Sequence, residues 1–85
     1  MPRFYFHVRH SEGRDEDLDG THFEDIEEAK VDAMRCLREI VADNLRAAQP
    51  VDIAAMDIID QRGVILATVS IDEAVLKPLV GRDEG

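Results

Sequence analysis

The stretch DIEEAKVDAMRCLREIVADNLRAAQP, residues 25–50, decides the fold, because it has the length and the spacing of one long amphipathic helix. Asp25 and Glu28 have the Asp-x-x-Glu spacing of a capping box, which marks a helix start. Pro50 ends the helix no later than Gln49, because proline has no backbone N–H to donate. The helix is predicted to bury one apolar stripe, made of Ile26, Ala29, Ala33, Leu37, Ile40, Val41, Leu45 and Ala48.

Two strands are predicted before this helix. Residues 3–9 are aromatic and β-branched, and they alternate in the manner of a half-buried strand. The polar residues 10–20 are predicted to form a connecting loop, and residues 20–23 a short strand that returns antiparallel to the first. The alternation places Phe4, Phe6 and Val8 on one face of the first strand, and Arg3, Tyr5, His7 and Arg9 on the other.

Two further strands, residues 56–60 and 64–70, are predicted around a tight turn that ends at Gly63. Residues 64–67 lack alternation, which favours a strand covered on both faces or a strand within a dimer. A capped helical turn follows from Ser70 toward Leu76 and is expected to break at Pro78. The fold class is therefore α+β with the order β-β-α-β-β: an antiparallel sheet with one helix across one face. We expect residues 1–80 to form a single domain and residues 81–85 to form a flexible acidic tail.

The charge of the 85-residue chain is −9, and most of it lies in one stretch. Residues 10–28 contain nine acidic side chains and one basic side chain, so they carry −8 of that charge. Such a stretch repels nucleic-acid phosphates and anionic membranes, and it suits cations or a basic protein partner. The alternative interpretation is a solvated acidic loop that keeps the protein soluble. A single cysteine, Cys36, and the lack of a leader or an apolar span favour the cytoplasm.

Three segments resemble a known family. The opening MPRFYFHVR, the pair Asp19-Gly20 before the helix, and the segment ADNLR at residues 42–46 are similar to alphaproteobacterial proteins that share domain of unknown function 6894. The likeness runs from residue 1 to about residue 70 and implies the same layout, but no activity. A weaker likeness, to small antitoxin domains of the HicB type, rests on the acidic loop and the DIEEA helix start.

The acidic loop contains the start of a calcium-binding pattern. Asp15, Asp17 and Asp19 are followed by Gly20, as in the first six positions of a calcium loop. The twelfth position is Ile26, where a bidentate glutamate normally stands. The three aspartates are candidate metal ligands. The alternative interpretation is an ordinary acidic loop that binds no metal ion.

Two other sites are candidates for binding. Arg3, Tyr5, His7 and Arg9 share one strand face, and this set resembles a small platform for single-stranded nucleic acid, in which bases stack on a tyrosine and arginines contact phosphates. The overall negative charge makes nucleic acid an unlikely ligand, and the alternative is that the arginines pair with carboxylates. Asn44 lies within the apolar stripe of the helix, so it either caps backbone carbonyls at the helix end or contributes to an interface.

The chain contains no recognisable catalytic or phosphate-binding motif, so we expect no enzyme, no catalytic residue and no cofactor. The leading hypothesis is a non-catalytic binding module that self-associates as a dimer. One alternative is an antitoxin-like or regulatory partner of a basic protein, and another is a calcium-responsive domain that uses residues 15–20.

Overall fold

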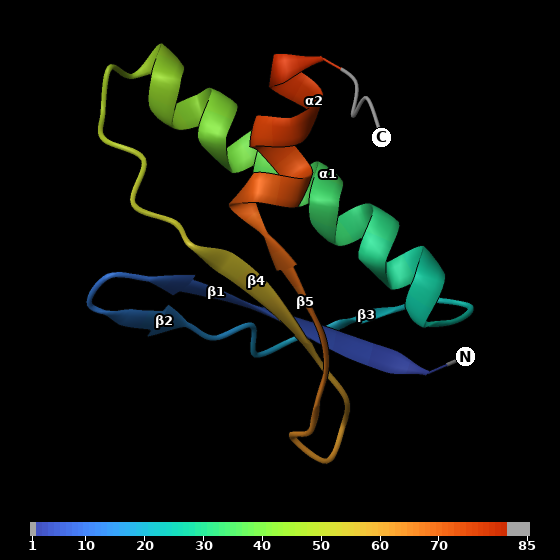
Figure 1. Cartoon of the computed structure of the whole chain (residues 1–85). Helices are drawn as coiled ribbons and strands as arrows, with labels where there is room; N and C mark the ends of the chain where they lie inside the picture. Colours follow the sequence, from blue (N-terminus) through green and yellow to red (C-terminus); the bar gives the residue numbers. More distant parts are fainter. Residues whose placement is uncertain (1, 82–85) are drawn as a thin grey trace.

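Residues 2–81 are described by the structure, a computed structural model, and they form an antiparallel sheet with its helices on one face (Figure 1). This arrangement confirms the predicted α+β class. The helices are α1 (Ile26–Arg46), η1 (Asp72–Leu76) and α2 (Lys77–Val80). The strands are β1 (Arg3–His10), β2 (Gly13–Asp15), β3 (Thr21–His22), β4 (Ala55–Ile59) and β5 (Ile65–Ser70).

The strand order is β2-β1-β4-β5, with β3 also paired to β1. β2 pairs with the end of β1 through Val8 opposite Asp15, and β3 pairs with its start through Arg3 opposite His22. β2 and β3 are therefore two pieces of one interrupted edge strand. The sequence predicted β3 as a strand but assigned residues 13–15 to a loop, which was wrong.

The core lies between the sheet and the helices. Phe23 packs against Phe4 and Phe6, with ring centroids 6.1 and 5.6 Å apart. From α1, the predicted stripe supplies Ala29, Ala33, Leu37 and Val41, which are all buried. Leu45, however, is 67% exposed, because the C-terminal end of α1 rises away from the sheet (Figure 1). The remaining members of the core come from both layers: Met56, Ile58, Val69 and Ala74.

The ends of α1 show how the sequence sets its limits. Asp25 is the N-cap, and its Oδ1 accepts a hydrogen bond from the Glu28 backbone N–H at 2.9 Å. At the other end, the N–H groups of Ala48 and Gln49 donate to the carbonyls of Leu45 and Asn44, which is the Schellman pattern. Ala48 adopts φ 56°, so this turn places alanine where glycine is favoured.

The turn between β4 and β5 matches the prediction, because Gly63 has φ 85° and its N–H donates to the Asp60 carbonyl. The prediction of a helix break at Pro78 was wrong. Pro78 lies in the first turn of α2, where a backbone N–H is not needed, so η1 runs directly into α2. The predicted flexible tail, residues 81–85, lies outside the described residues except for Gly81.

Candidate functional site

The face of the sheet opposite the helices carries alternate residues of β1, among them the predicted binding set. Phe4 is in the core with Phe6 and Val8 packed near it, so Arg3, Tyr5, His7 and Arg9 point to the other face. No helix of the described chain lies over this face (Figure 1). The sheet therefore presents these four side chains together, as the alternation predicts.

Asp57 of β4 is the centre of that face, and the sequence interpretation did not single it out. Its carboxylate is 2% exposed, and it accepts hydrogen bonds from Arg9 Nε at 3.0 Å and Arg9 Nη2 at 2.8 Å. The Thr68 hydroxyl of β5 donates to the same carboxylate at 2.8 Å. The Arg9 guanidinium, with help from Thr68 and against the effect of burial, lowers the pKa of Asp57. An acid inside the apolar run of residues 53–59 is the sequence signal that marks this position.

The other polar side chains of this face, Arg3 and His7, also have partners within the chain. Arg3 donates to the Asp19 carbonyl at 2.6 Å and lies 3.0 Å from the His22 ring. His7 Nδ1 accepts a hydrogen bond from the Asp17 backbone N–H at 3.2 Å. The alternative prediction, that the arginines pair with carboxylates, holds for Arg9, which pairs with Asp57. His7 is correspondingly a hydrogen-bonded residue of the sheet.

Asp17 occupies the gap between β2 and β3. Its Oδ2 accepts a hydrogen bond from the Phe6 backbone N–H, and its Oδ1 accepts from the N–H groups of Asp19 and Gly20. Burial favours the protonated acid, but these three donors and the nearby His7 outweigh it and lower the pKa of Asp17. The carboxylate therefore takes the place of a strand carbonyl beside Phe6 and holds the loop in shape.

Gly20 closes this loop against the sheet. It has φ 76°, and a Cβ at this position would lie 2.8 Å from Tyr5 Cε2 and 3.0 Å from the Phe4 carbonyl oxygen. Both the backbone angle and the close approach require glycine. The Asp-Gly pair thus has a structural role in the fold.

The structure does not gather the three predicted metal ligands into one site. Asp17 binds backbone N–H groups, while Asp15 lies 3.4 Å from His10 with its side chain largely exposed. Within residues 2–81, no group of three or more His, Cys, Asp or Glu side chains is arranged to hold a metal ion.

Asn44 and Cys36 lie on α1 and are both partly buried. Asn44 Nδ2 donates a hydrogen bond to the Pro50 carbonyl at 3.4 Å, just beyond the end of the helix. This contact agrees with the predicted role of Asn44 as a donor to backbone carbonyls near the helix end. Burial and the nearby Asp32 carboxylate raise the pKa of the Cys36 thiol, which leaves it poorly reactive.

β5 forms the second edge of the sheet, with β4 as its one strand neighbour in the described part of the chain. Ile65 is 52% exposed and Leu66 is 44% exposed, so the prediction of a strand covered on both faces was wrong for the single chain. From Val64 to Ser70 the strand has no charged residue and no proline. Sequence reasoning detected the missing alternation, but it did not place this strand at an edge.

A second apolar feature is an open groove of about 310 Å³ between the end of α1 and the C-terminal helices. It is lined by Arg38, Val41, Ala42, Leu45, Val75, Pro78 and Leu79.

None of the described helices is long and apolar enough to cross a membrane.

Comparison with known protein families matches residues 3–72 to the model of a domain of unknown function, DUF6894. The chain belongs to the DUF6894 family. No curated protein and no solved structure gives a significant match. The DUF6894 region contains the whole sheet, the Asp17 loop and α1, and it ends at the start of η1. The β5 edge therefore lies within the family domain, whereas Val75, Pro78 and Leu79 of the groove follow it.

Proposed function

We propose that this DUF6894 chain is a non-catalytic interaction module of the cytoplasm that self-associates. The observation that carries this proposal is the difference between the two edges of its sheet. The β2–β3 edge is broken into pieces of three and two residues, and charged side chains surround it. The β5 edge has six residues, no charge and no interruption by proline.

An edge strand of the β5 kind pairs readily with another strand, because its outer backbone N–H and C=O groups have no ladder partner. Monomeric proteins protect such edges with charges, bulges or very short strands. The β4–β5 ladder has one irregularity: Ile58 pairs with Ala67 and Ile59 pairs with Ile65, so Leu66 is the extra residue of a bulge, and β5 is regular only from Ala67 to Ser70. These features support a role in which β5 is covered by another chain.

The titrating groups favour a non-catalytic function. The acids with lowered pKa values are Asp17, Asp57 and Asp60, and each is held ionised by donors that also shape the fold. A catalytic acid or base works best with a pKa near the operating pH, which is the opposite direction for a carboxyl group. The free thiol Cys36, with its raised pKa, suits the reducing cytoplasm.

Sedimentation equilibrium over a wide range of protein concentration tests the proposal. We expect a reversible association whose limiting mass is a small multiple of the chain mass, and we expect it to persist in high salt because β5 carries no charge. A chain that remains monomeric at every concentration would contradict self-association. Far-UV circular dichroism at the same concentrations confirms that the monomer is folded.

A second candidate, an antitoxin-like or regulatory partner of a basic protein, is favoured by the acidic loop. Leu18 is 84% exposed between two aspartates, while Asp17 fixes the backbone beside it. The loop therefore presents a leucine and several carboxylates in a defined shape. A pull-down from the host tests this candidate with Asp15→Lys and Asp19→Lys combined, which spares Asp17. Loss of a near-stoichiometric basic partner is expected, and an unchanged set of partners would contradict it.

A further inference from the structure

We propose that the groove between the end of α1 and the C-terminal helices binds an amphipathic helix of a partner protein, and that an acidic residue of that helix pairs with Arg38. The groove belongs to the helical layer, so this inference goes beyond self-association through β5 and does not depend on it. Three observations carry it: the apolar lining of the groove, the helical spacing of its two walls, and an arginine without a partner.

The groove is apolar and open to solvent. Arg38 is the one charged residue among those that line it. Leu45 on the α1 wall is 67% exposed, and Leu79 on the α2 wall is 77% exposed. Leu76 and Val80, which are neighbours of the α2 wall in sequence, are exposed as well. Large apolar side chains gathered at one place on a surface are typical of an interaction site.

Both walls of the groove are helical rows of side chains. On α1 the lining residues follow the spacing i, i+3, i+4 and i+7, at positions 38, 41, 42 and 45. On the C-terminal helices they follow i, i+3 and i+4, at positions 75, 78 and 79. Two such rows accept the side chains of a third helix, because the ridges of one helix pack into the grooves of another.

The same geometry argues against other kinds of occupant. An extended peptide gains affinity from backbone hydrogen bonds to a strand, and backbone groups inside a helix already pair with one another. Small ligands bind in clefts that bury most of their surface, whereas this groove of about 310 Å³ is open. A helix needs neither feature, because it satisfies its own backbone and covers the groove from outside.

Arg38 gives the groove its charge. Among residues 2–81, it is the one lysine or arginine for which the structure shows neither a hydrogen bond nor an ion pair. None of its helical neighbours three and four residues away is acidic: they are Met34, Arg35, Val41 and Ala42. Arg35 and Arg46, the other arginines of α1, pair with acids at this spacing. The Arg38 guanidinium is therefore available to a carboxylate from another chain.

Charge complementarity sets the pattern of the partner helix. An acidic residue at the end of its apolar stripe faces Arg38, and a guanidinium can bind a carboxylate at two points. A wholly apolar occupant is disfavoured, because it would remove water from Arg38 without replacing it. The outer face of the partner helix is neutral or basic, because a chain with a net charge of −9 repels a helix that is acidic throughout.

Two synthetic helical peptides of about 20 residues test the charge of the partner. Both have leucines spaced i, i+3, i+4 and i+7 and lysines on the outer face. One has glutamate at the end of the leucine stripe, and the other has glutamine there. Fluorescence polarisation at physiological salt should show that the wild-type chain binds the glutamate peptide at least about threefold more tightly.

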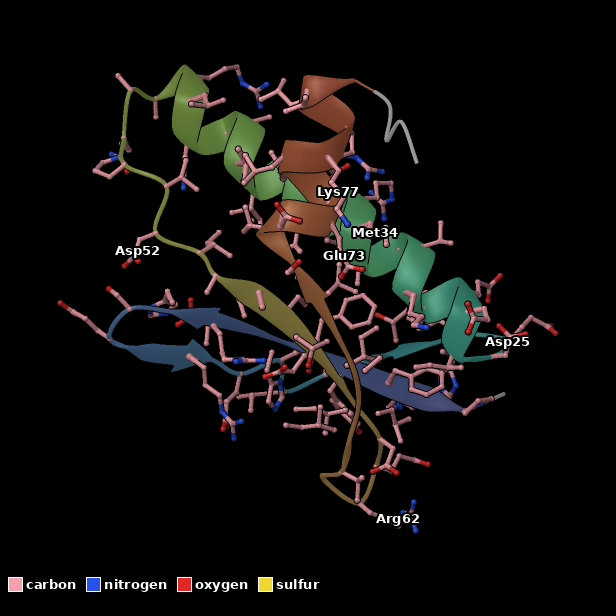
Figure 2. All side chains as sticks on the ribbon, in the orientation of Figure 1. Asp25, Met34, Asp52, Arg62, Glu73 and Lys77 are labelled. Atoms are coloured by element: carbon pink, nitrogen blue, oxygen red, sulfur yellow. The ribbon has the colours of Figure 1, made fainter. Side chains whose placement is uncertain are left out.

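Arg38→Gln should abolish this preference between the two peptides, because the preference comes from the Arg38 guanidinium. The charge-matched control is Arg62→Gln, which should retain the preference. Arg62 is 79% exposed, and Figure 2 shows it at the opposite end of the molecule from α2. A preference for glutamate that survives Arg38→Gln would overturn the proposal.

Leu45→Ser and Leu79→Ser test the apolar walls. Each variant removes a largely exposed leucine, so the core is retained, and we expect the dissociation constant of the glutamate peptide to rise at least about fivefold. The control Val31→Ser changes an exposed valine of α1 outside the groove lining and should leave binding unchanged. Circular dichroism confirms that each variant is folded.

The other occupants give distinct results. Failure of both peptides to bind saturably would overturn the proposal, and binding of decanoate in their place would make the groove a site for lipid carboxylates. Sedimentation of Leu79→Ser should give the same masses as the wild type. Loss of self-association in this variant would assign the groove to a second copy of the chain and would overturn the inference.

Discussion

Arg9 and Asp57 form a two-point contact across the central strands of the sheet, with Arg9 Nε and Nη2 3.0 and 2.8 Å from the two carboxylate oxygens. The carboxylate is buried on the face that has no helix, while the guanidinium is half exposed. Because Thr68 donates to the same group, one acid ties β1, β4 and β5 together. The contact therefore connects the centre of the sheet to β5, the edge strand that we propose is covered by another chain.

Replacement of Asp57 should destabilise the fold. Asp57→Ala leaves the Thr68 hydroxyl and the inner guanidinium without an acceptor, and we expect the free energy of unfolding to fall by about 2 kcal/mol. Asp57→Asn retains one acceptor and should lose about half as much. Urea denaturation followed by circular dichroism measures both variants. An unchanged urea midpoint in Asp57→Ala would show that the contact makes no net contribution to the free energy of unfolding.

The stability of the chain should fall in acid. The pKa values of Asp17 and Asp57 are lowered in the folded state, so their contribution is fully present above the unfolded value of about 3.9. It is lost as the pH drops through the lower, folded-state values. Relief of the net negative charge acts in the opposite direction only above the isoelectric pH of about 4.6; below it the chain becomes positively charged, and its self-repulsion adds to the loss.

Thermal melts between pH 2 and 7 measure this dependence. The double variant Asp17→Asn, Asp57→Asn removes both titrating groups, so its melting temperature should change less across the acidic range than that of the wild type. Parallel curves for the two proteins would mean that other groups control the acid response.

Gly20→Ala should cost more stability than Gly63→Ala. Both glycines have positive φ, 76° and 85°, so each substitution carries the same backbone strain of about 1 kcal/mol. A Cβ at position 63 meets nothing within 4 Å, whereas one at position 20 meets Tyr5 and the Phe4 carbonyl. We therefore expect an additional loss of about 1–3 kcal/mol for Gly20→Ala in urea denaturation. Equal losses in the two variants would show that the loop shifts away from the sheet at little cost.

Ala48→Gly should stabilise the protein. Ala48 has φ 56° in the Schellman turn after α1, and glycine adopts that angle without strain. We expect the free energy of unfolding to rise by about 0.5–1 kcal/mol, because the relief is partly offset by the greater freedom of glycine in the unfolded chain. Ala42→Gly, inside α1, is the matched control and should lower stability. A decrease for Ala48→Gly would show that the left-handed turn is not maintained in solution.

The sequence predicted the features that depend on neighbouring residues. The Asp25 cap, the helix over its main length and the left-handed Gly63 all follow from local spacing, and the structure contains them. β2 was missed because Gly13, Arg14 and Asp15 have no strand preference of their own. Their extended shape comes from pairing with Val8–His10.

The features that depend on strand order could not be predicted in the same way. Asp57 is opposite His7 only because β4 lies beside β1, and this order also leaves β5 at an edge. The four predicted sheet-face residues do share a face. Their partners come from distant parts of the chain, so alternation within β1 could not reveal that Arg9 is already paired with Asp57.

The Asp17 carboxylate has a consequence for how the family domain can vary. One side chain completes the hydrogen bonding of the sheet where the edge strand is interrupted, so the residues beside it are not required to be a strand. Glu16, Leu18 and Asp19 can then change in identity while the fold is retained, provided that Asp17 and Gly20 remain. The loop is thus a place where new specificity can evolve on an unchanged scaffold.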